Sequence, residues 1–224
     1  MKDPNSRENL KDIKIDVNLA YLIGVLHSDG CIYAFNDRKR NKKITRLNLT
    51  IGEKSIPMAE KFRNILQTYC GINVKLRKSH YKNSYQIQTS INRSRNIFES
   101  WRKEELIEPI KSDIELFGGY LAGLIDGDGH IKIKHNKDRI LPQCVVRISS
   151  DHPLTNLKES MKELFNCKIH HYKDKRSACV DTCFYISNKN TKLFYKFVYP
   201  HITLPHKINK LDKFLRLKNE PVRI

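Results

Sequence analysis

The stretch that decides the fold runs from Tyr120 to Gly129 and reads Tyr-Leu-Ala-Gly-Leu-Ile-Asp-Gly-Asp-Gly. A second copy, Tyr-Leu-Ile-Gly-Val-Leu-His-Ser-Asp-Gly, occupies residues 21–30, and 99 positions separate the matching Asp29 and Asp128. Apolar residues recur at helical spacing in both copies, which predicts two buried helices. Each helix ends at an Asp-Gly pair, so the chain carries two equivalent helices with an acidic residue at the same end.

Small residues form a second face on each helix, at four-residue spacing. They are Ala20, Gly24, Ser28, Gly119, Gly123 and Gly127. Because glycine inside a helix costs about 1 kcal/mol relative to alanine, this spacing calls for a compensating contact. Small residues let helix axes approach closely, so we expect the two helices to pack side by side in parallel. Gly30 and Gly129 are then expected to end them.

Parallel packing would bring Asp29 and Asp128 together at the negative ends of two helix dipoles. Two adjacent carboxylates repel each other, so either one takes up a proton or a metal ion bridges them. Oxygen ligands of this kind suit Mg²⁺. An EF-hand calcium loop starting at Asp126 is excluded, because its twelfth position is Lys137 instead of glutamate. One Asp-Gly pair alone is commonly just a turn, but two matched copies favour a metal site.

The second copy resembles the signature motif of the LAGLIDADG homing endonucleases almost letter for letter, and the first copy resembles it more loosely. The resemblance implies a single-chain, pseudo-symmetric enzyme that acts as a monomer on a long, asymmetric double-stranded DNA site. It implies cleavage of both strands with Mg²⁺, across the minor groove, leaving short 3′ overhangs. The departure from the motif is His27, which stands where the second copy has Asp126.

The same resemblance implies the ligands of the metal. Asp29 and Asp128, together with the backbone carbonyl groups of Ser28 and Gly127, would hold two or more Mg²⁺ ions. Mn²⁺ or Ca²⁺ is expected to substitute for Mg²⁺ in binding. As in other two-metal phosphodiester hydrolyses, the ions would activate water and stabilise the leaving 3′-oxygens.

The charge of the chain agrees with a nucleic-acid partner. A formal net charge of +18 and a pI near 9.7 indicate a polyanion. The excess is spread evenly over the two halves, which suits two DNA half-sites better than a basic tail would. No apolar run reaches the ~18 residues that a membrane span requires, and residues 1–14 lack a signal-peptide core. We therefore expect an intracellular protein, in the cytoplasm or an organelle, with no membrane partner.

The six cysteines are expected to be reduced thiols in this setting. One group of cysteines and histidines invites a zinc-site interpretation, although its irregular spacing and its strand-like alternation disfavour it. Its members are Cys167, His170, His171, Cys179 and Cys183.

Hydrophobic periodicity predicts the same order of elements in both halves: helix, strand, strand, helix, strand, strand, helix. In the first half the strands are expected near residues 31–35, 46–51, 73–78 and 85–91, and the later helices over 55–70 and 92–101. Asp16 or Asn18 can cap the first helix. We predict an α+β fold of two pseudo-symmetric αββαββα halves, residues 1–108 and 119–224, joined by a linker over 109–118. The antiparallel sheets would together form a DNA-binding saddle.

The outward faces of the strands are the expected DNA-binding surface. A two-stranded ribbon fits the major groove, where Arg, Lys, Gln and Asn can read base edges. Polar residues on an antiparallel sheet can also simply face water, but the positive excess favours phosphate binding. The candidate DNA-binding residues are Arg38, Arg40, Lys42, Arg46, Asn48, Thr50, Arg77, Gln86, Gln88, Lys132, Lys134, Arg147 and Ser149.

Two further pairs of residues are candidates for catalysis. Lys111 and Lys207 each follow the strands of their half in a Pro-X-Lys sequence. The resemblance implies a lysine from this region near the scissile phosphates, where it would stabilise developing negative charge. Lys207 is favoured, Lys111 and Lys210 are its rivals, and a solvated lysine at a helix start is the plain alternative.

Glu53 and Asp151 occupy equivalent positions, just before the second helix of each half. The resemblance implies a polar, water-ordering residue at this place. An acidic residue there could order water around the metals, although Asp151 is also well placed to cap its helix, which we favour.

Other functions remain compatible with the same fold. The resemblance extends to maturases that assist splicing of intron RNA, and to relatives that bind DNA without cutting it. Neither role requires both aspartates, so the presence of Asp29 and Asp128 argues for cleavage. A structural metal-binding regulator is a third interpretation, which would show Mg²⁺-dependent folding and no nuclease activity.

Overall fold

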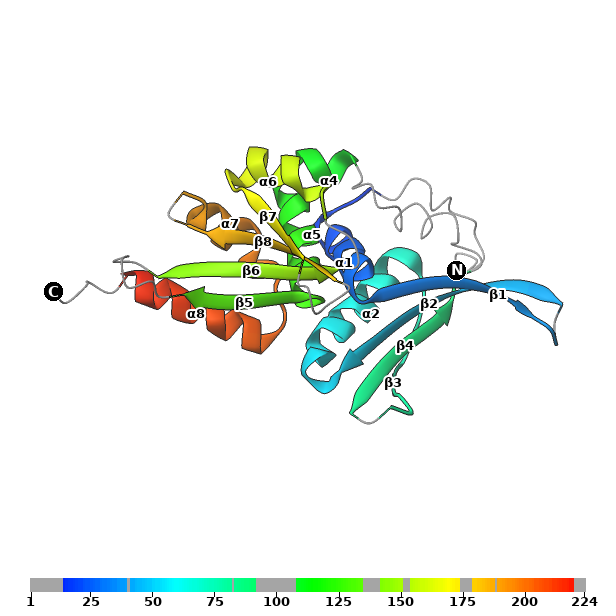
Figure 1. The fold of residues 1–224 in the computed structure, drawn as a ribbon. Coiled ribbons are helices and arrows are strands. Elements are labelled where there is room, and N and C mark those ends of the chain that lie inside the picture. The colour runs from blue at the N-terminus through cyan, green and yellow to red at the C-terminus, as the bar shows by residue number, and fades with distance from the viewer. Residues whose placement is uncertain are drawn as a thin grey trace.

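The chain is described by a computed structural model, which covers residues 14–39, 41–81, 83–91, 108–134, 142–150, 154–173, 179–187 and 189–219. At its centre, helices α1 (Val17–Ser28) and α5 (Ile114–Asp126) lie side by side (Figure 1). An aspartate begins each helix. The carboxylate of Asp16 accepts from the backbone N–H of Leu19 at 2.9 Å, and that of Asp113 accepts from Glu115 at 2.8 Å.

The two central helices touch through their glycines and run in parallel. A Cβ atom added to Gly24 would lie 2.1 Å from the carbonyl oxygen of Tyr120, and one added to Gly123 would lie 2.2 Å from that of Tyr21. Only a residue without a Cβ allows backbones to approach this closely. The small-residue face expected from the sequence is therefore the contact between the helices, and residues 19–26 of α1 are all buried.

Each half carries a four-stranded antiparallel sheet. The first contains β1 (Gly30–Asp37), β2 (Lys42–Gly52), β3 (Leu76–Lys78) and β4 (Ser84–Ser90), in the order β1-β2-β4-β3. The second contains β5 (Gly129–Lys134), β6 (Gln143–Ser150), β7 (Ile169–Lys173) and β8 (Val180–Ile186), in the order β5-β6-β8-β7. The identical order confirms the α+β fold with two related halves.

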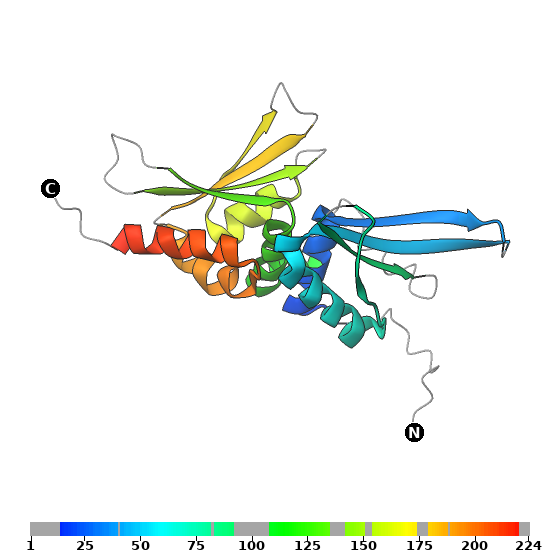
Figure 2. The same cartoon turned by 90° about the horizontal axis from the view of Figure 1, so that it is seen from below.

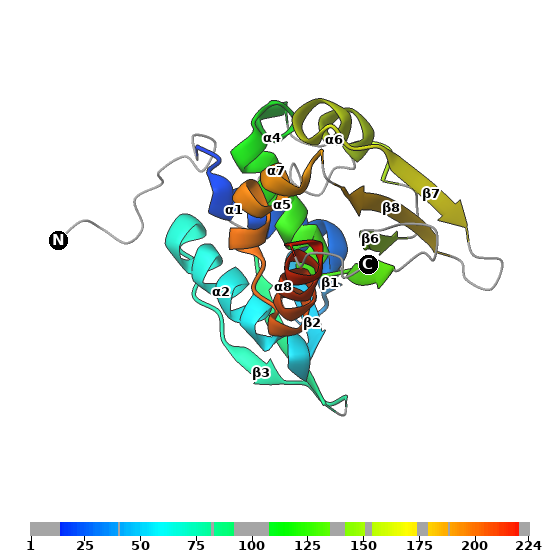
Figure 3. The same ribbon diagram turned by 90° about the vertical axis from the view of Figure 1, so that its left-hand side faces the viewer.

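The remaining helices lie on one side of the sheets. They are η2 (Glu53–Ser55), α2 (Ile56–Cys70), α4 (Glu108–Ser112), α6 (Leu157–Phe165), α7 (Thr191–Phe197), η4 (Tyr199–His201) and α8 (Pro205–Asn219). Figure 2 shows the helices along one side and the two sheets diverging from the centre on the other. An end view places α2 and α7 on one side and β7 and β8 on the other (Figure 3). The core fills the space between these layers.

Alternation along β2 shows how each sheet separates its two faces. Leu47, Leu49 and Ile51 are buried against the helices, whereas the residues between them lie on the opposite face. Among the described residues, no helix lies on that opposite face in either half, so it can receive a partner.

Some local expectations need correction. The helices end at Asp29 and Gly127, while Gly30 and Gly129 are the first residues of β1 and β5. Glycine is required there by space and not by helix-ending geometry, because a Cβ on Gly129 would lie 2.4 Å from the carbonyl oxygen of Ile125.

The expected linker, residues 109–118, contains α4 and the first turn of α5, so helix begins before Gly119. The helix expected over residues 92–101 lies outside the described residues. Within the described part of the chain, no helix has the length and apolar character needed to cross a membrane.

Candidate metal centre and nucleic-acid interface

The two motif aspartates meet where the strands leave the central helices. Asp29 caps the C-terminus of α1, and Asp128 follows Gly127, the cap of α5. The pKa of Asp29 is raised from 3.8 to about 6, first by burial and then by the neighbouring Asp128 carboxylate, while the Lys207 ammonium opposes the rise. The carboxylates therefore lie close enough to repel each other, which is the condition that a bound cation relieves.

Gly127 is part of the same contact. A Cβ atom added to it would lie 2.0 Å from the Oγ of Ser28 and 3.4 Å from the Oδ2 of Asp29. The structure thus brings together the four residues expected to supply metal ligands from both helices. Their oxygen donors fit a hard divalent cation.

The donor set of this site is small. Among the residues described, no three His, Cys, Asp or Glu side chains cluster as a metal site would need. A cation at Asp29 and Asp128 would therefore complete its coordination with carbonyl groups, water and a substrate phosphate, as Mg²⁺ commonly does. The same observation leaves the cysteines and histidines around Cys183 without support as a zinc site.

A buried polar network lies directly beneath the carboxylate pair. Asp126 is 1% exposed, and its Oδ2 accepts from the Tyr21 hydroxyl at 2.7 Å, the Thr203 backbone N–H at 2.8 Å and the Thr203 hydroxyl at 2.7 Å. Its other oxygen accepts from the Leu204 N–H at 3.4 Å. Asp126 thus ties the segment before α8 to both central helices, and its carboxylate is turned away from a metal role.

The outward face of the first sheet gathers the residues expected to bind DNA. In the strand register, Arg77 lies opposite Gln86, Gln86 opposite Thr50, and Gln88 opposite Asn48. The amide of Gln86 donates to the Oδ1 of Asn48 at 2.6 Å. Arg46 continues the same face of β2. These side chains share one surface, as the alternation of the sequence indicated.

The tip of the β1–β2 hairpin is basic. Lys42 lies opposite Asp37 in the register, and Arg38 is exposed in the turn between the strands. Arg40 lies outside the described residues.

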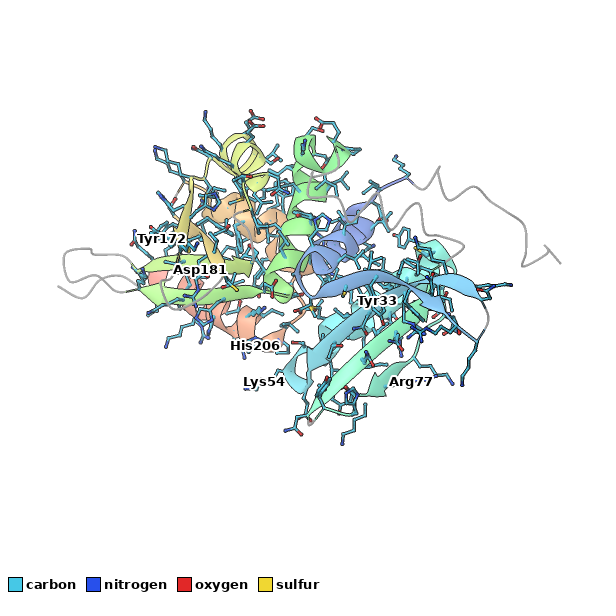
Figure 4. All side chains as sticks on the ribbon, turned by 45° about the vertical axis from the view of Figure 1, so that its right-hand side comes forward. Tyr33, Lys54, Arg77, Tyr172, Asp181 and His206 are labelled. Carbon is cyan, nitrogen blue, oxygen red and sulfur yellow. The ribbon has the colours of Figure 1, made fainter. Side chains whose placement is uncertain are left out.

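The second sheet presents a more charged face. Lys132 and Lys134 point outward from β5, and Arg147 and Ser149 from β6. Figure 4 shows Tyr33 and Arg77 on the first sheet and Tyr172 and Asp181 on the second. Both sheets therefore offer polar side chains that a duplex could contact.

Comparison with known families agrees with this architecture. The family described as "LAGLIDADG-like domain" matches residues 16–100, and the family described as "LAGLIDADG endonuclease" matches residues 121–220. The two matches cover both halves and both motif helices. The chain belongs to the LAGLIDADG family.

Solved structures of LAGLIDADG-type fold are similar over most of their length. I-DmoI in complex with DNA and Ca matches with a TM-score of 0.62 at 16% identity, covering 88% of this chain and 97% of that one. I-GzeII in complex with its DNA target gives 0.59 at 12%, covering 91% and 89%. I-SmaMI bound to an uncleaved DNA target with calcium ions gives 0.58 at 13%, covering 92% of each. Likeness at such identities shows the fold. Comparison with curated proteins gave no match.

Lys207 of this LAGLIDADG chain is buried beneath the two aspartates. It is 6% exposed, and its Nζ donates to the carbonyl oxygen of Ile125, to that of Asp126 at 2.8 Å and to that of Gly127 at 3.3 Å. Burial lowers its pKa to about 8, although nearby carboxylates oppose this. The ammonium group therefore caps the C-terminus of α5, where the helix dipole favours a cation.

The other candidate catalytic residues come from different parts of the fold. Lys111 belongs to α4, at the N-terminal end of α5, and the length of α5 puts it ~20 Å from the carboxylates. It is thus not brought to the site. Glu53 is exposed in η2 after β2, and Asp151 lies outside the described residues. Lys210 donates to the Ile131 carbonyl at 3.0 Å and so contacts the second sheet.

Several surface residues were missed from the sequence. Tyr33 and Phe35 share the outward face of β1, where the Arg46 guanidinium lies 4.6 Å from the centre of the Phe35 ring. Asp181 and His130 lie on the outward face of the second sheet. Counting alternate positions outward from Asp29 and Asp128 would have identified the residues on β1 and β5, but β8 needs the strand register.

Proposed function

We propose that this LAGLIDADG protein is a site-specific homing endonuclease that hydrolyses both strands of a long, asymmetric double-stranded DNA site. The observation that carries the proposal is the meeting of Asp29 and Asp128 at the point from which both sheets diverge. A nuclease site needs cation ligands next to a DNA-binding surface, and this arrangement supplies both.

The proposal includes Mg²⁺ as the natural cofactor, with two or more ions held by Asp29, Asp128 and the carbonyl groups of Ser28 and Gly127. When bound, the ions would lower the pKa of attacking water and stabilise the leaving 3′-oxygens. Structures of I-DmoI with DNA and Ca, and with DNA and Mn, support the use of a divalent metal.

The residues of the chain divide the remaining work. The outward faces of the two sheets would each bind one half-site, residues 1–108 the first and 119–224 the second, and neutralise its phosphates. Lys207 would hold the α5 terminus in place and add positive charge below the metals. Both motifs lie in one chain with unlike halves, which supports a monomer acting on an asymmetric site. The proposal also includes short 3′ overhangs as the product ends.

Cleavage of a plasmid library carrying random inserts, with Mg²⁺ and with EDTA, tests the proposal. The wild-type protein should linearise the subset of plasmids that contain its site, only with the metal present. Asp128→Asn should abolish cleavage while binding of the selected site survives, because the substitution removes a ligand and leaves both sheets intact. Asp212→Asn removes a carboxylate from α8, where it accepts from the Tyr199 hydroxyl at 2.7 Å, and is the charge-matched control.

Retained double-strand cleavage by Asp128→Asn would remove Asp128 from the chemistry. Specific binding without cleavage under any divalent metal would favour the non-cleaving alternative, including a maturase.

A further inference from the structure

The outward face of the second sheet holds one acidic side chain among the residues described there. That residue is Asp181 of β8, and its neighbours on the face include Lys132, Arg147 and His130. A carboxylate on a surface that binds phosphates repels them, so its presence needs a compensating role.

The contacts of Asp181 indicate what that role is. Its Oδ2 accepts from the Nη1 of Arg147 at 3.3 Å, and its Oδ1 accepts from the Oγ of Ser149 at 2.5 Å. Ser149 lies directly opposite Asp181 in the strand register. The side chain of Asp181 is 18% exposed and that of Arg147 is 48% exposed, so the carboxylate is largely buried and the arginine side chain is accessible to a partner.

We propose that Arg147 reads a guanine in the major groove and that Asp181 is the positioning residue that aims its guanidinium. The inference rests on the DNA-binding part of the proposed function. Arginine carries five N–H donors, and one bond to Asp181 leaves enough of them for the paired contact to O6 and N7 of guanine. A fixed guanidinium loses less side-chain freedom on binding and rejects other bases more strongly.

The place of Arg147 in the sheet locates the guanine. Arg147 lies opposite His130, which is two residues beyond Asp128. The base it contacts should therefore fall in the second half-site, in the part nearest the cleavage centre. Direct reading of cytosine by Asp181 is disfavoured, because both of its oxygens already accept hydrogen bonds.

The test is enrichment of bound duplexes from a random library in Ca²⁺, followed by sequencing, for the wild type and four variants. The wild-type consensus should contain one guanine at a position read by Arg147. In Arg147→Lys the preference for guanine at that position should fall about 5-fold to 100-fold, because lysine keeps the charge but lacks the paired N–H donors of the guanidinium. Asp181→Asn should lower the preference at that same position while affinity for random DNA stays equal or rises. Ser149→Ala should act in the same direction, more weakly.

Asp212→Asn is the matched control, because it changes the net charge equally and its carboxylate bonds to Tyr199 instead of to Arg147 and Ser149. It should leave the consensus unchanged. Thermal melts of each variant show whether it is folded, and Ser149→Ala still tests the contact if Asp181→Asn is unstable.

Three results would overturn the inference. The first is an unchanged guanine preference in folded Asp181→Asn, and the second is a wild-type consensus without a guanine that depends on Arg147. The third is a cytosine preference that Asp181→Asn loses and Arg147→Lys retains. Enrichment of the expected consensus by a protein that never cleaves with Mg²⁺ would instead sink the nuclease proposal and leave this one standing.

Discussion

The two halves use equivalent tyrosines in the same way but give them different partners. Tyr21 of α1 donates to Asp126 of α5 at 2.7 Å, and Tyr120 of α5 bonds to the Nδ1 of His27 on α1 at 3.0 Å. The His27 and Tyr120 rings also meet edge to face, with centroids 5.5 Å apart. Each hydroxyl crosses to the residue two positions before the motif aspartate, Asp29 or Asp128, of the other helix.

The difference lies in what surrounds each partner. Asp126 accepts four hydrogen bonds, and two half-buried or buried ammonium groups, Lys61 and Lys207, lie near it with their pKa lowered to about 8 by burial. Lys61 of α2 lies 3.6 Å from the centre of the Tyr21 ring. The contacts of Asp126 therefore connect the segment before α8, in the second half, to α1 and α2 of the first half.

The comparison teaches that the mismatch between the motifs, His27 against Asp126, is structural. Each side chain bonds to a tyrosine across the helix pair. The aspartates that follow, Asp29 and Asp128, stay equivalent. The two halves thus carry the same residue at the last acidic position of the motif, and different residues at the position two before it, which contacts the tyrosine.

The strongest way to break the arrangement is to separate the helices. Gly123→Val should cost more than about 4 kcal/mol of unfolding free energy, because its side chain would overlap the Tyr21 backbone. Gly52→Ala is the control, since its Cβ would meet nothing within 4 Å and should change stability by less than about 0.5 kcal/mol. Chemical denaturation measures both. Similar stabilities for the two variants would refute the helix contact.

The second test compares the two tyrosine partners. Asp126→Ala removes the acceptor of the Thr203 backbone N–H and of the Tyr21 and Thr203 hydroxyls, and takes a carboxylate from the Lys61 and Lys207 ammonium groups. We therefore expect a loss of about 3 kcal/mol. His27→Ala removes the hydrogen bond to Tyr120 and the edge-to-face ring contact, and should cost less, about 1 kcal/mol. Equal costs in denaturant titrations would show that the second half gains no special anchoring from Asp126.

The third and smallest effect concerns the repulsion between the aspartates. The pKa of Asp29 is about 6 in the fold against 3.8 for a free side chain, so the metal-free native state holds that proton more tightly than the unfolded state does. Unfolding free energy should therefore fall as pH rises from about 4 to about 6, and stay lower above that range.

Asp29→Asn removes the repulsion and should stabilise the metal-free protein at pH 7 by on the order of 1 kcal/mol at this half-buried site. Added Mg²⁺ should raise the melting temperature of the wild type and leave that of the variant nearly unchanged. Thermal melts in EDTA and in Mg²⁺ measure both effects. A wild type whose stability is flat between pH 4 and 7 would contradict the burial of Asp29 beside Asp128.

Local pattern was enough to predict the two motif helices, the order of helices and strands along the chain and the outward face of β2, because these depend on spacing within a few residues. It failed where contacts join distant residues. The bonds of Lys207 to the end of α5, about 80 positions away in the chain, leave no local signal, so the sequence alone did not place its ammonium group there. Lys111 has the same Pro-X-Lys sequence but lies in α4, before α5.

Asp181 escaped notice for a related reason. An isolated acid in a strand suggests a solvated side chain, and only the pairing of β6 with β8 places it between Arg147 and Ser149.

The backbone contact at Gly24 and Gly123 also limits how proteins of the LAGLIDADG family can be re-engineered. A chimera that exchanges one half for that of a relative will assemble only if the incoming motif helix brings a glycine to this crossing point. Candidate parents for a hybrid protein can therefore be checked for glycine at the positions of Gly24 and Gly123 before any DNA-contacting residue is considered.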